Sequence, residues 1–311
     1  MRFLSKPTSI DFMAARKPAV IISIVLVVLA IVGLALGGLK LGVDFTGGTV
    51  MEVRYPQAVE LDQVRNALAQ SKAGHATVQH FGTSQDVLIR VAPKEGLSAA
   101  MVSGKVMEVL TKAGGSDAQL RRVEAFGPQV GKELRDQGGL AVLFALGGIM
   151  FYVAMRFERR MAVGAVVATV HDVVITVGLF MLSGMDFDLN ALAAALTVLG
   201  YSVNDTIVVY DRIRENFRRM RSGTPVELVN LSLNQTLSRT INTHVTVLLV
   251  VMTLFFFGGE SIHAFAYIMI FGVIVGTFSS IYIASALTLW LGFSRSDLMP
   301  VKKEGVADDR P

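Results

Sequence analysis

The sequence predicts an α-helical integral membrane protein with six transmembrane helices and one small α+β domain of the ferredoxin-like type outside the membrane. Hydrophobic residues make up 52% of the 311 residues and charged residues 17%, whereas a soluble domain carries about 25% charged residues. The apolar residues gather in blocks of about 20, the length that crosses about 30 Å of hydrocarbon. Between the first two blocks, residues 40–137 alternate between strand and helix patterns.

The apolar blocks predict the membrane spans. We expect six of them, at residues 19–39, 138–155, 162–182, 189–210, 241–257 and 264–291, the last five within a region that runs from 138 to 292. Lys and Arg gather before the first span, between the second and third, after the fourth and after the sixth, whereas the loops 183–188 and 258–263 contain neither. Because basic loops stay in the cytoplasm, both ends, residues 1–18 and 293–311, are expected there.

The loop at residues 40–137 lies outside and predicts a small folded domain. Alternating apolar residues predict strands at 49–55, 76–82, 86–92 and 119–126, and apolar residues at helical spacing predict helices at 59–71 and 97–114. The resulting order, β-α-β-β-α-β, is that of the ferredoxin-like split motif.

The exit of the first span, LGVDFTGGTVMEVRY, predicts a structural joint between the membrane and this domain. The pair Gly47-Gly48 gives the backbone freedom to leave the helix axis and enter a strand. Asp44 and Thr46 can hydrogen-bond the backbone groups exposed at such a turn. The residues alone favour a structural hinge, and a site where Asp44 binds something remains the alternative.

Several polar side chains fall inside the predicted spans, where an ionisable group is costly and is therefore a candidate for function. His171 and Asp172 lie near the middle of the third span, and Asn204 and Asp205 lie in the fourth, with Tyr201 one helical turn before Asp205. These residues are candidates for a proton pathway. Contacts that only hold helices together are the alternative.

The fifth span opens with a polar face that contains Arg239, Thr243 and Thr246, with Asn242 beside it. Arg239 is either a cytoplasmic flank of the span or a partner of Asp205, if the fourth and fifth spans pack together. Arginine does not deprotonate in proteins. In such a pair the carboxylate would therefore titrate, and its proton would decide whether the ion pair forms.

Two further patterns concern packing and the cytoplasmic surface. Gly272, Gly276, Ser280 and Ala284 form a ladder of small residues that lets helices approach closely. Residues 211–238 contain cationic and apolar residues at helical spacing, which predicts an amphipathic segment lying on anionic lipid at the cytoplasmic surface. A docking site for a cytoplasmic partner is the alternative.

The sequence lacks the motifs that are typical of several classes of function. The segment GPQVGKEL has one residue too few between its glycines for a phosphate-binding loop, and Glu133 stands where Ser or Thr is needed. There is no cysteine, no His/Asp/Glu cluster with metal-ligand spacing and no G-x-S-x-G. We expect no enzyme, no cofactor, no metal and no nucleic-acid partner. An ion gradient is the remaining energy source.

Six motifs between residues 41 and 291 together resemble the bacterial SecD/SecF family of export proteins, within the resistance–nodulation–division superfamily. They are LGVDFTGGT, FGPQVGKEL, HDVVITVGLF, LGYSVNDTIVVYDRIRENFR, LNQTLSRTINTHVT and FGVIVGTFSSIYIAS, in that order. The short outside domain resembles the SecF members of the family rather than the SecD members.

The resemblance implies a multi-pass protein of the bacterial inner membrane with one large periplasmic loop. It would be half of a twelve-span transporter, paired with SecD and associated with the SecYEG channel and YajC. Using the proton-motive force, the pair would help to draw preproteins outward after the SecA-driven step. An exporter of small molecules or lipids from the same superfamily, or a scaffold of the translocon, remains the alternative.

The resemblance also assigns roles to residues. The proton-pathway aspartate and arginine of the family correspond to Asp205 and Arg239. The family's DFTGG motif corresponds to Asp44, Phe45, Thr46, Gly47 and Gly48, a mechanical joint where the outside domain meets the membrane. His244 either extends the polar path or faces headgroups or a neighbouring helix.

Overall fold

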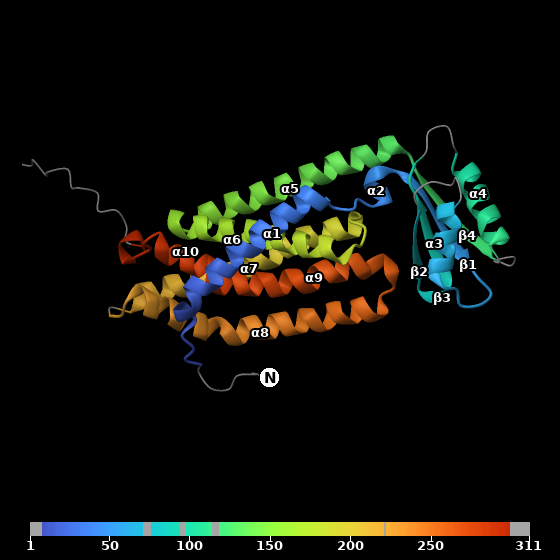
Figure 1. The fold of residues 1–311 in the computed structure, drawn as a ribbon. Coiled ribbons are helices and arrows are strands. Elements are labelled where there is room, and N and C mark those ends of the chain that lie inside the picture. The colour runs from blue at the N-terminus through green and yellow to red at the C-terminus, as the bar shows by residue number, and fades with distance from the viewer. Residues whose placement is uncertain (1–7, 71–75, 94–97, 114–117, 221, 299–311) are drawn as a thin grey trace, which may run out of the picture.

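The structure is a computed structural model that describes residues 8–70, 76–93, 98–113, 118–220 and 222–298. A bundle of long helices carries a small α/β domain at one end (Figure 1). Residues 299–311 of the expected cytoplasmic tail and the first seven residues of the expected cytoplasmic N-terminus lie outside the described residues.

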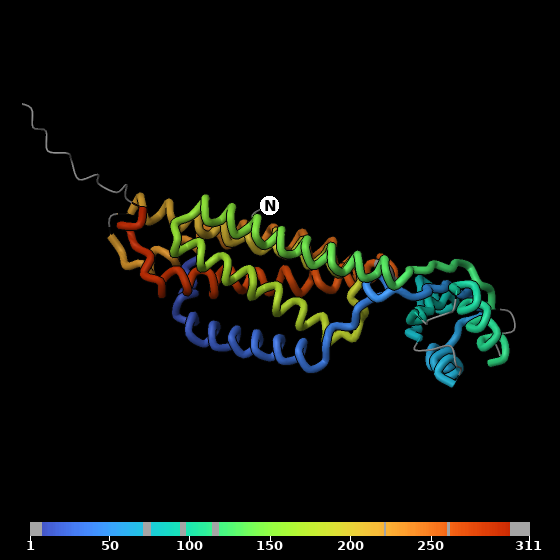
Figure 2. Tube along the Cα trace, turned by 90° about the horizontal axis from the view of Figure 1, so that it is seen from above, coloured from blue at the N-terminus to red at the C-terminus, as the bar shows by residue number. Residues whose placement is uncertain are grey.

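Six helices are long and apolar enough to cross a membrane, which confirms the predicted fold class. The first comprises a 3-10 turn at Phe12–Ala15 and α1 at Arg16–Gly37, and the next four are α5 (Pro128–Arg156), α6 (Arg159–Ser183), α7 (Leu189–Arg219) and α8 (Pro225–Phe257). The sixth is continuous through α9 (Glu260–Ser279), a π-helical turn called η2 (Ser280–Ala284) and α10 (Ser285–Trp290). Helix α1 lies at one edge of the bundle, against α6 (Figure 2).

The predicted amphipathic segment at residues 211–238 is not a helix of its own. Its first part belongs to α7, which continues to Arg219, and its last part belongs to α8, which begins at Pro225, so only residues 220–224 form the turn between the two helices. A capping box starts α8, because the Thr224 hydroxyl accepts the Glu227 N–H while the Glu227 carboxylate accepts the Thr224 N–H. The apolar residues of the segment are buried in the bundle core, among them Phe217 and Val229, instead of facing lipid.

The ladder of small residues lies against α7 in register. An added Cβ on Gly272 would overlap Cγ2 of Val198, so no larger residue fits there without movement. The hydroxyls of Ser280 and Thr206 are 3.1 Å apart. Two turns of close contact thus hold the last span against α7, the helix that carries Asp205.

The domain outside the bundle has the predicted ferredoxin-like topology. Its elements are β1 (Gly48–Arg54), α3 (Leu61–Gln70), β2 (Ala76–Phe81), β3 (Thr83–Val91), α4 (Ala99–Lys112) and β4 (Gln119–Phe126). The strands form one antiparallel sheet in the order β2-β3-β1-β4. Helices α3 and α4 bury one sheet face through residues such as Val53, Ile89, Leu68 and Val106, and the opposite face is turned toward the bundle (Figure 1).

Candidate functional site

The chain leaves α1 by pairing with the loop between α6 and α7. The Gly42 N–H donates to the Phe187 carbonyl at 2.8 Å, and the Phe187 N–H donates to the Lys40 carbonyl at 2.6 Å. A single helical turn follows, α2 (Val43–Thr46), and leads into β1. The motif that the sequence marked as a joint therefore touches the ends of α1, α6 and α7 before it enters the sheet.

The two glycines of the motif are required by conformation and by space. Gly47 has φ +74° and Gly48 has φ +139°, values that side chains of L-residues rarely adopt. An added Cβ on Gly47 would lie 2.8 Å from Cα of Pro128, and one on Gly131 would lie 2.6 Å from the Gly47 nitrogen. The joint is thus pressed against the first turn of α5, a contact that involves a third glycine outside the motif.

The polar residues of the motif bind backbone groups. The Leu189 N–H, at the start of α7, donates to Oδ2 of Asp44 at 3.1 Å, and the Thr46 hydroxyl donates to the Gly42 carbonyl at 3.1 Å. A carboxylate at this place also complements the positive end of the helix dipole. Phe45 is buried and stacks on Phe187 with ring centroids 6.1 Å apart. Asp44 thereby ties the joint directly to α7.

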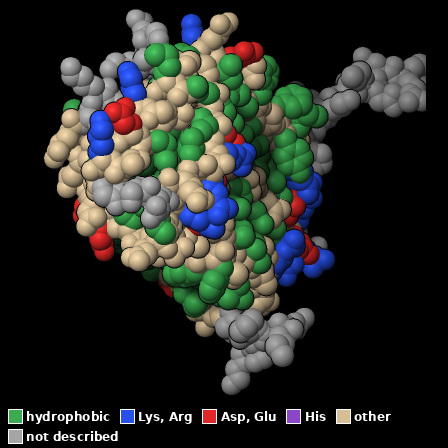
Figure 3. Space-filling model, turned by 90° about the vertical axis from the view of Figure 1, so that its right-hand side faces the viewer, with side chains coloured by type: hydrophobic (Ala, Val, Ile, Leu, Met, Phe, Trp, Pro, Cys, Tyr) green, Lys and Arg blue, Asp and Glu red, His purple; other side chains and the backbone are tan. Residues whose placement is uncertain are grey.

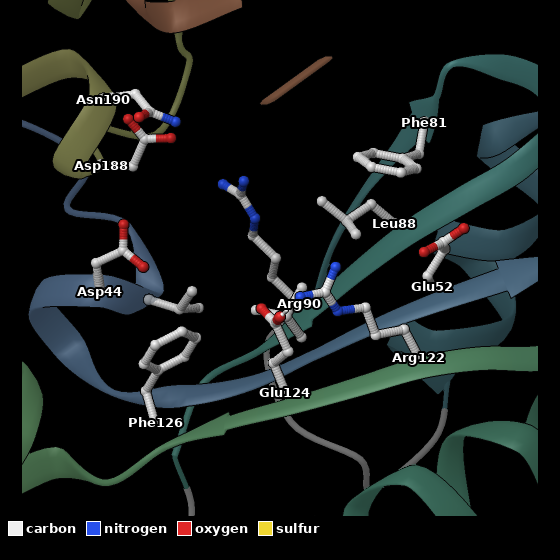
Figure 4. A pocket seen from close by; sticks show the side chains of 12 residues that line it. Asp44, Glu52, Phe81, Leu88, Arg90, Arg122, Glu124, Phe126, Asp188 and Asn190 are labelled. Carbon is white, nitrogen blue, oxygen red and sulfur yellow. Dashed lines mark ion pairs between the residues drawn. The ribbon is translucent and has the colours of Figure 1, made fainter. Parts of the chain in front are cut away.

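The sheet meets the bundle across a cavity of about 230 Å³. Arg90, Arg122 and Glu124 reach into it from the sheet, while Asp44 and Asp188 line the side that belongs to the bundle (Figure 4). Beside the cavity, Arg90 forms a largely buried ion pair of 2.9 Å with Asp186, in the loop between α6 and α7. Seen from the end that carries the sheet, the surface mixes basic and acidic side chains and has no continuous patch of one sign (Figure 3).

We predict that Gly47→Ala destabilises the protein more than Gly82→Ala. Both glycines have positive φ, at +74° and +77°, but an added Cβ at Gly82 meets no atom within 4 Å. Both variants carry the penalty of a positive φ at a residue with a side chain, on the order of 1–3 kcal/mol, and only Gly47→Ala adds a clash with α5. Thermal unfolding of both purified variants measures the difference. Equal melting temperatures would contradict the close contact between α2 and α5.

Asp172 is held by side chains from three helices. It is fully buried on α6, and His171 Nδ1 lies 2.8 Å from its Oδ1. The hydroxyls of Ser202 on α7 and Ser279 on α9 donate to its Oδ2 at 2.5 Å and 2.6 Å. Both oxygens of this carboxylate have hydrogen-bond partners. The group therefore acts as a fixed acceptor that joins α6, α7 and α9.

Asp205 differs from Asp172 in having few hydrogen-bond partners around its carboxylate. It is 5% exposed on α7, and its Oδ2 has no hydrogen-bond partner. A cavity of about 10 Å³ adjoins it, lined on the α8 side by Thr236 and Thr240 and on the last span by Ser280. Such a space is at the lower limit for one water molecule. Of the two buried aspartates within the described part of the helix bundle, Asp205 is therefore the one whose oxygen is free to gain or lose a bond.

The basic residue closest to Asp205 is not the predicted one. Nε2 of His244 lies 3.4 Å from Oδ2 of Asp205, whereas Arg239 forms no ion pair with that carboxylate and its charge acts on it only from a longer distance. The predicted ion pair with Arg239 is absent because α8 turns that residue outward. A buried polar stripe faces the bundle instead: Ser232, Thr236, Thr240 and His244. The spacing of four residues in this stripe is the signal that would have identified His244.

Other predicted residues lie on outer faces of this chain. Asn204 is exposed on α7, in line with Ala193, Thr197 and Gly200, so it does not join the buried cluster. On α8 the hydroxyls of Thr243 and Thr246 donate to carbonyls of their own helix. Small and polar residues at such positions suit contact with another helix. Among the residues that the structure describes, no group of three or more His, Asp and Glu side chains could hold a metal.

Comparison with known proteins gives the following matches. A family model described as the C-terminal part of the SecD/SecF protein export membrane proteins matches residues 105–294, and one for the SecD/SecF GG motif matches residues 32–59. The protein translocase subunit SecF of Vibrio alginolyticus is 46% identical over 310 residues, 99% of this chain and 98% of that protein. SecF of Pseudomonas aeruginosa is 45% identical over 304 residues, with 97% and 98% covered.

Solved structures match as well. The crystal structure of SecDF from Thermus thermophilus, described as a translocon-associated membrane protein, has a TM-score of 0.81 at 37% identity. The match covers 91% of this chain and 39% of the SecDF chain. SecDF in a super-membrane-facing form matches with a TM-score of 0.70 at 36% identity. This chain thus spans about two-fifths of the length of those two structures.

Proposed function

The chain belongs to the SecD/SecF family of protein export membrane proteins, and we propose that it uses the proton-motive force to promote protein translocation across the bacterial inner membrane. With SecF relatives matched along nearly its whole length, it is a SecF subunit of the Sec translocation machinery. The observation that carries the proton role is Asp205, a buried carboxylate whose Oδ2 has no hydrogen-bond partner and adjoins a cavity.

A proton-driven device needs a group that gains and loses a proton during each cycle. Burial of a carboxylate without donors costs several kcal/mol when it is charged, so such a position is costly unless the charge is transient. Each proton that crosses the membrane releases about 2.3 kcal/mol per 100 mV. Asp172 does not suit this role, since three neighbours already hold it. We assign Asp172 and His171 to the support of the pathway.

The outward polar faces support a second membrane unit beside this one. Asn204 and Arg239 are exposed on this chain although they lie in the spans that surround Asp205. An exposed Asn or Arg at membrane depth is costly in lipid. We propose that SecD covers this side, giving a twelve-span unit, and that protons reach Asp205 along it. Association with SecYEG and YajC, and action after SecA, belong to the same proposal.

Helix α7 offers a direct mechanical link from the proton site to the outside domain. Asp205 lies on α7, and Asp44 of the joint binds the N–H of Leu189 at the start of that helix. A shift of α7 along its axis would therefore move the joint and, through β1, the sheet. In this proposal both termini are cytoplasmic and the sheet domain is periplasmic, on the side where preproteins emerge. We propose no enzymatic activity for this subunit.

The test is export into inverted membrane vesicles from cells depleted of their own SecF. We expect the chain, added with SecD, to restore the acceleration of preprotein translocation by a proton gradient. Equal restoration with and without the gradient would identify a scaffold that only stabilises the channel.

A further inference from the structure

Asp205 and His244 form a contact that brings together α7, α8 and α9. His244 is 8% exposed, and its Nε2 lies 3.4 Å from Oδ2 of Asp205. Its other ring nitrogen, Nδ1, lies 2.7 Å from the hydroxyl oxygen of Thr277 on α9. The imidazole ring is therefore fixed between a carboxylate on one side and a hydroxyl on the other.

The hydroxyl of Thr277 bears on which ring nitrogen of His244 carries hydrogen. It donates to the Val273 carbonyl, one turn earlier in α9, at 2.8 Å. A hydroxyl has one hydrogen, so as long as Thr277 donates to Val273, its oxygen can only accept from His244 and Nδ1 is the donor. In a neutral imidazole the second nitrogen is then bare. The lone pair of Nε2 consequently points at Oδ2 of Asp205.

Two bare acceptors 3.4 Å apart in a buried site repel each other, and a proton between them converts the repulsion into a hydrogen bond. We propose that Asp205 and His244 share one proton between Oδ2 and Nε2, so that the proton-binding unit of this subunit is the pair. The inference rests on the proposed use of the proton gradient through Asp205, and it identifies the second group. Within the pair, the proton passes from oxygen to the Nε2 lone pair, the O–H electrons remain on the carboxylate, and the total charge is unchanged.

The other titratable and charged groups around this pair lie on the helices packed against it. On α6, which packs against α7 and α9, His171 and Asp172 are already in contact with each other. On α7, the neighbouring titratable residue is Tyr201, one turn away. On α8, Arg239 is exposed and forms no ion pair with Asp205, but its positive charge acts on that carboxylate from a longer distance. On α9 the titratable residues all precede residue 268, far from Thr277. The 3-10 turn at Phe12–Ala15 and α10, which also pack on α8, contain no titratable residue.

Release of the shared proton gives the pair a mechanical consequence. The carboxylate then faces the lone pair of a neutral imidazole, whose tautomer Thr277 holds in place. Asp205 belongs to α7 while His244 belongs to α8, so the repulsion acts between two helices. Proton release therefore favours separation of α8 from α7 at this level, and proton binding favours the approach seen in the structure.

The test is solid-state NMR of the SecD-containing complex in lipid bilayers, with ¹⁵N-histidine and ¹³C-aspartate labels. The chain has five histidines, and loss of a signal in His244→Gln assigns the relevant one. We expect Nδ1 of His244 to be protonated, and Nε2 and the Asp205 carboxyl to respond to pH in one common step. Thr277→Val should let the Nε2–H tautomer appear, whereas Thr277→Ser should retain the wild-type pattern.

Asp205→Asn should remove the common step from His244 and leave His171 unchanged, although His171 also adjoins a buried aspartate. A bare Nδ1 in the wild-type protein would overturn the proposal, as would a His244 response that persists unchanged in Asp205→Asn. Measuring the gradient dependence of export by Asp205→Asn distinguishes failure of the shared-proton proposal from failure of the proposed function. If export loses its gradient dependence while the ring and carboxyl titrate independently, only the shared proton is refuted. Should both residues share a proton while export keeps its gradient dependence, the proposed function fails instead.

Discussion

Asp205→Asn is expected to remove the whole gradient-dependent part of protein export and to leave the protein folded. Asparagine has nearly the same size as aspartate but cannot bind or release a proton near neutral pH. The polar neighbour of Oδ2 of Asp205 that the structure shows is Nε2 of His244 at 3.4 Å, so the substitution affects at most this one long contact. We expect a change in unfolding free energy of less than about 1 kcal/mol, within the range of ordinary substitutions.

The measurement is pulse-labelling of a preprotein in cells whose only SecF is the variant, with SecD co-purification as the check on assembly. Asp211→Asn is the matched control, because it lies on the same helix and removes the same charge from an exposed ion pair with Arg156. Exposed pairs contribute little, so this control should export at the wild-type rate. Wild-type export by Asp205→Asn would show that the carboxylate only fills space.

Asp172→Ala should have the largest effect on stability. The substitution leaves His171 Nδ1 and the hydroxyls of Ser202 and Ser279 without their common acceptor inside the bundle. Removal of one partner from a buried, hydrogen-bonded charged site costs about 3–5 kcal/mol. Because these donors come from three helices, the loss weakens the contacts of α6, α7 and α9 together.

Thermal unfolding in detergent measures this effect, with Asp205→Ala as the matched control on another buried aspartate. The control removes a carboxylate whose Oδ2 has one long contact, with Nε2 of His244 at 3.4 Å, instead of three hydrogen bonds, so we expect a much smaller decrease in melting temperature. If Asp172→Ala is no less stable than Asp205→Ala, the three hydrogen bonds do not hold the helices together.

The features that repeat along the chain could be predicted from the sequence. Blocks of apolar residues revealed six spans, and the alternation of strand and helix patterns revealed the ferredoxin-like order. The Gly47-Gly48 turn was also predictable, because positive φ values favour glycine. The contact of Gly47 with α5 was not, since it depends on Gly131 at a distant place in the sequence.

The spacing of polar residues in the sequence did not decide which face of α8 points toward Asp205. This helix carries two polar stripes, one that includes Arg239, Thr243 and Thr246 and one that ends at His244. Residues 239 and 240 point about 100° apart in a helix, so only one stripe can face Asp205. Packing selects the stripe of Thr240 and His244, both of which are buried. Likewise, only the packing distinguishes Asp172, which is fully bonded, from Asp205.

Helices α5 and α8 extend beyond the predicted spans for a related reason. Hydropathy marks the part of a helix that lies in hydrocarbon, and both helices extend beyond it. Helix α5 begins at Pro128 and α8 at Pro225, where proline suits the first turn. These polar extensions are the parts that contact the joint at one end of the bundle and the turn after α7 at the other.

The most direct test follows the completion of a stalled preprotein in inverted vesicles, with wild type or Asp205→Asn added back at matched levels, with and without a proton gradient. We expect the gradient to accelerate completion with the wild-type chain and to have no effect with Asp205→Asn. Equal acceleration of both would contradict the central claim and would locate the proton chemistry outside this chain.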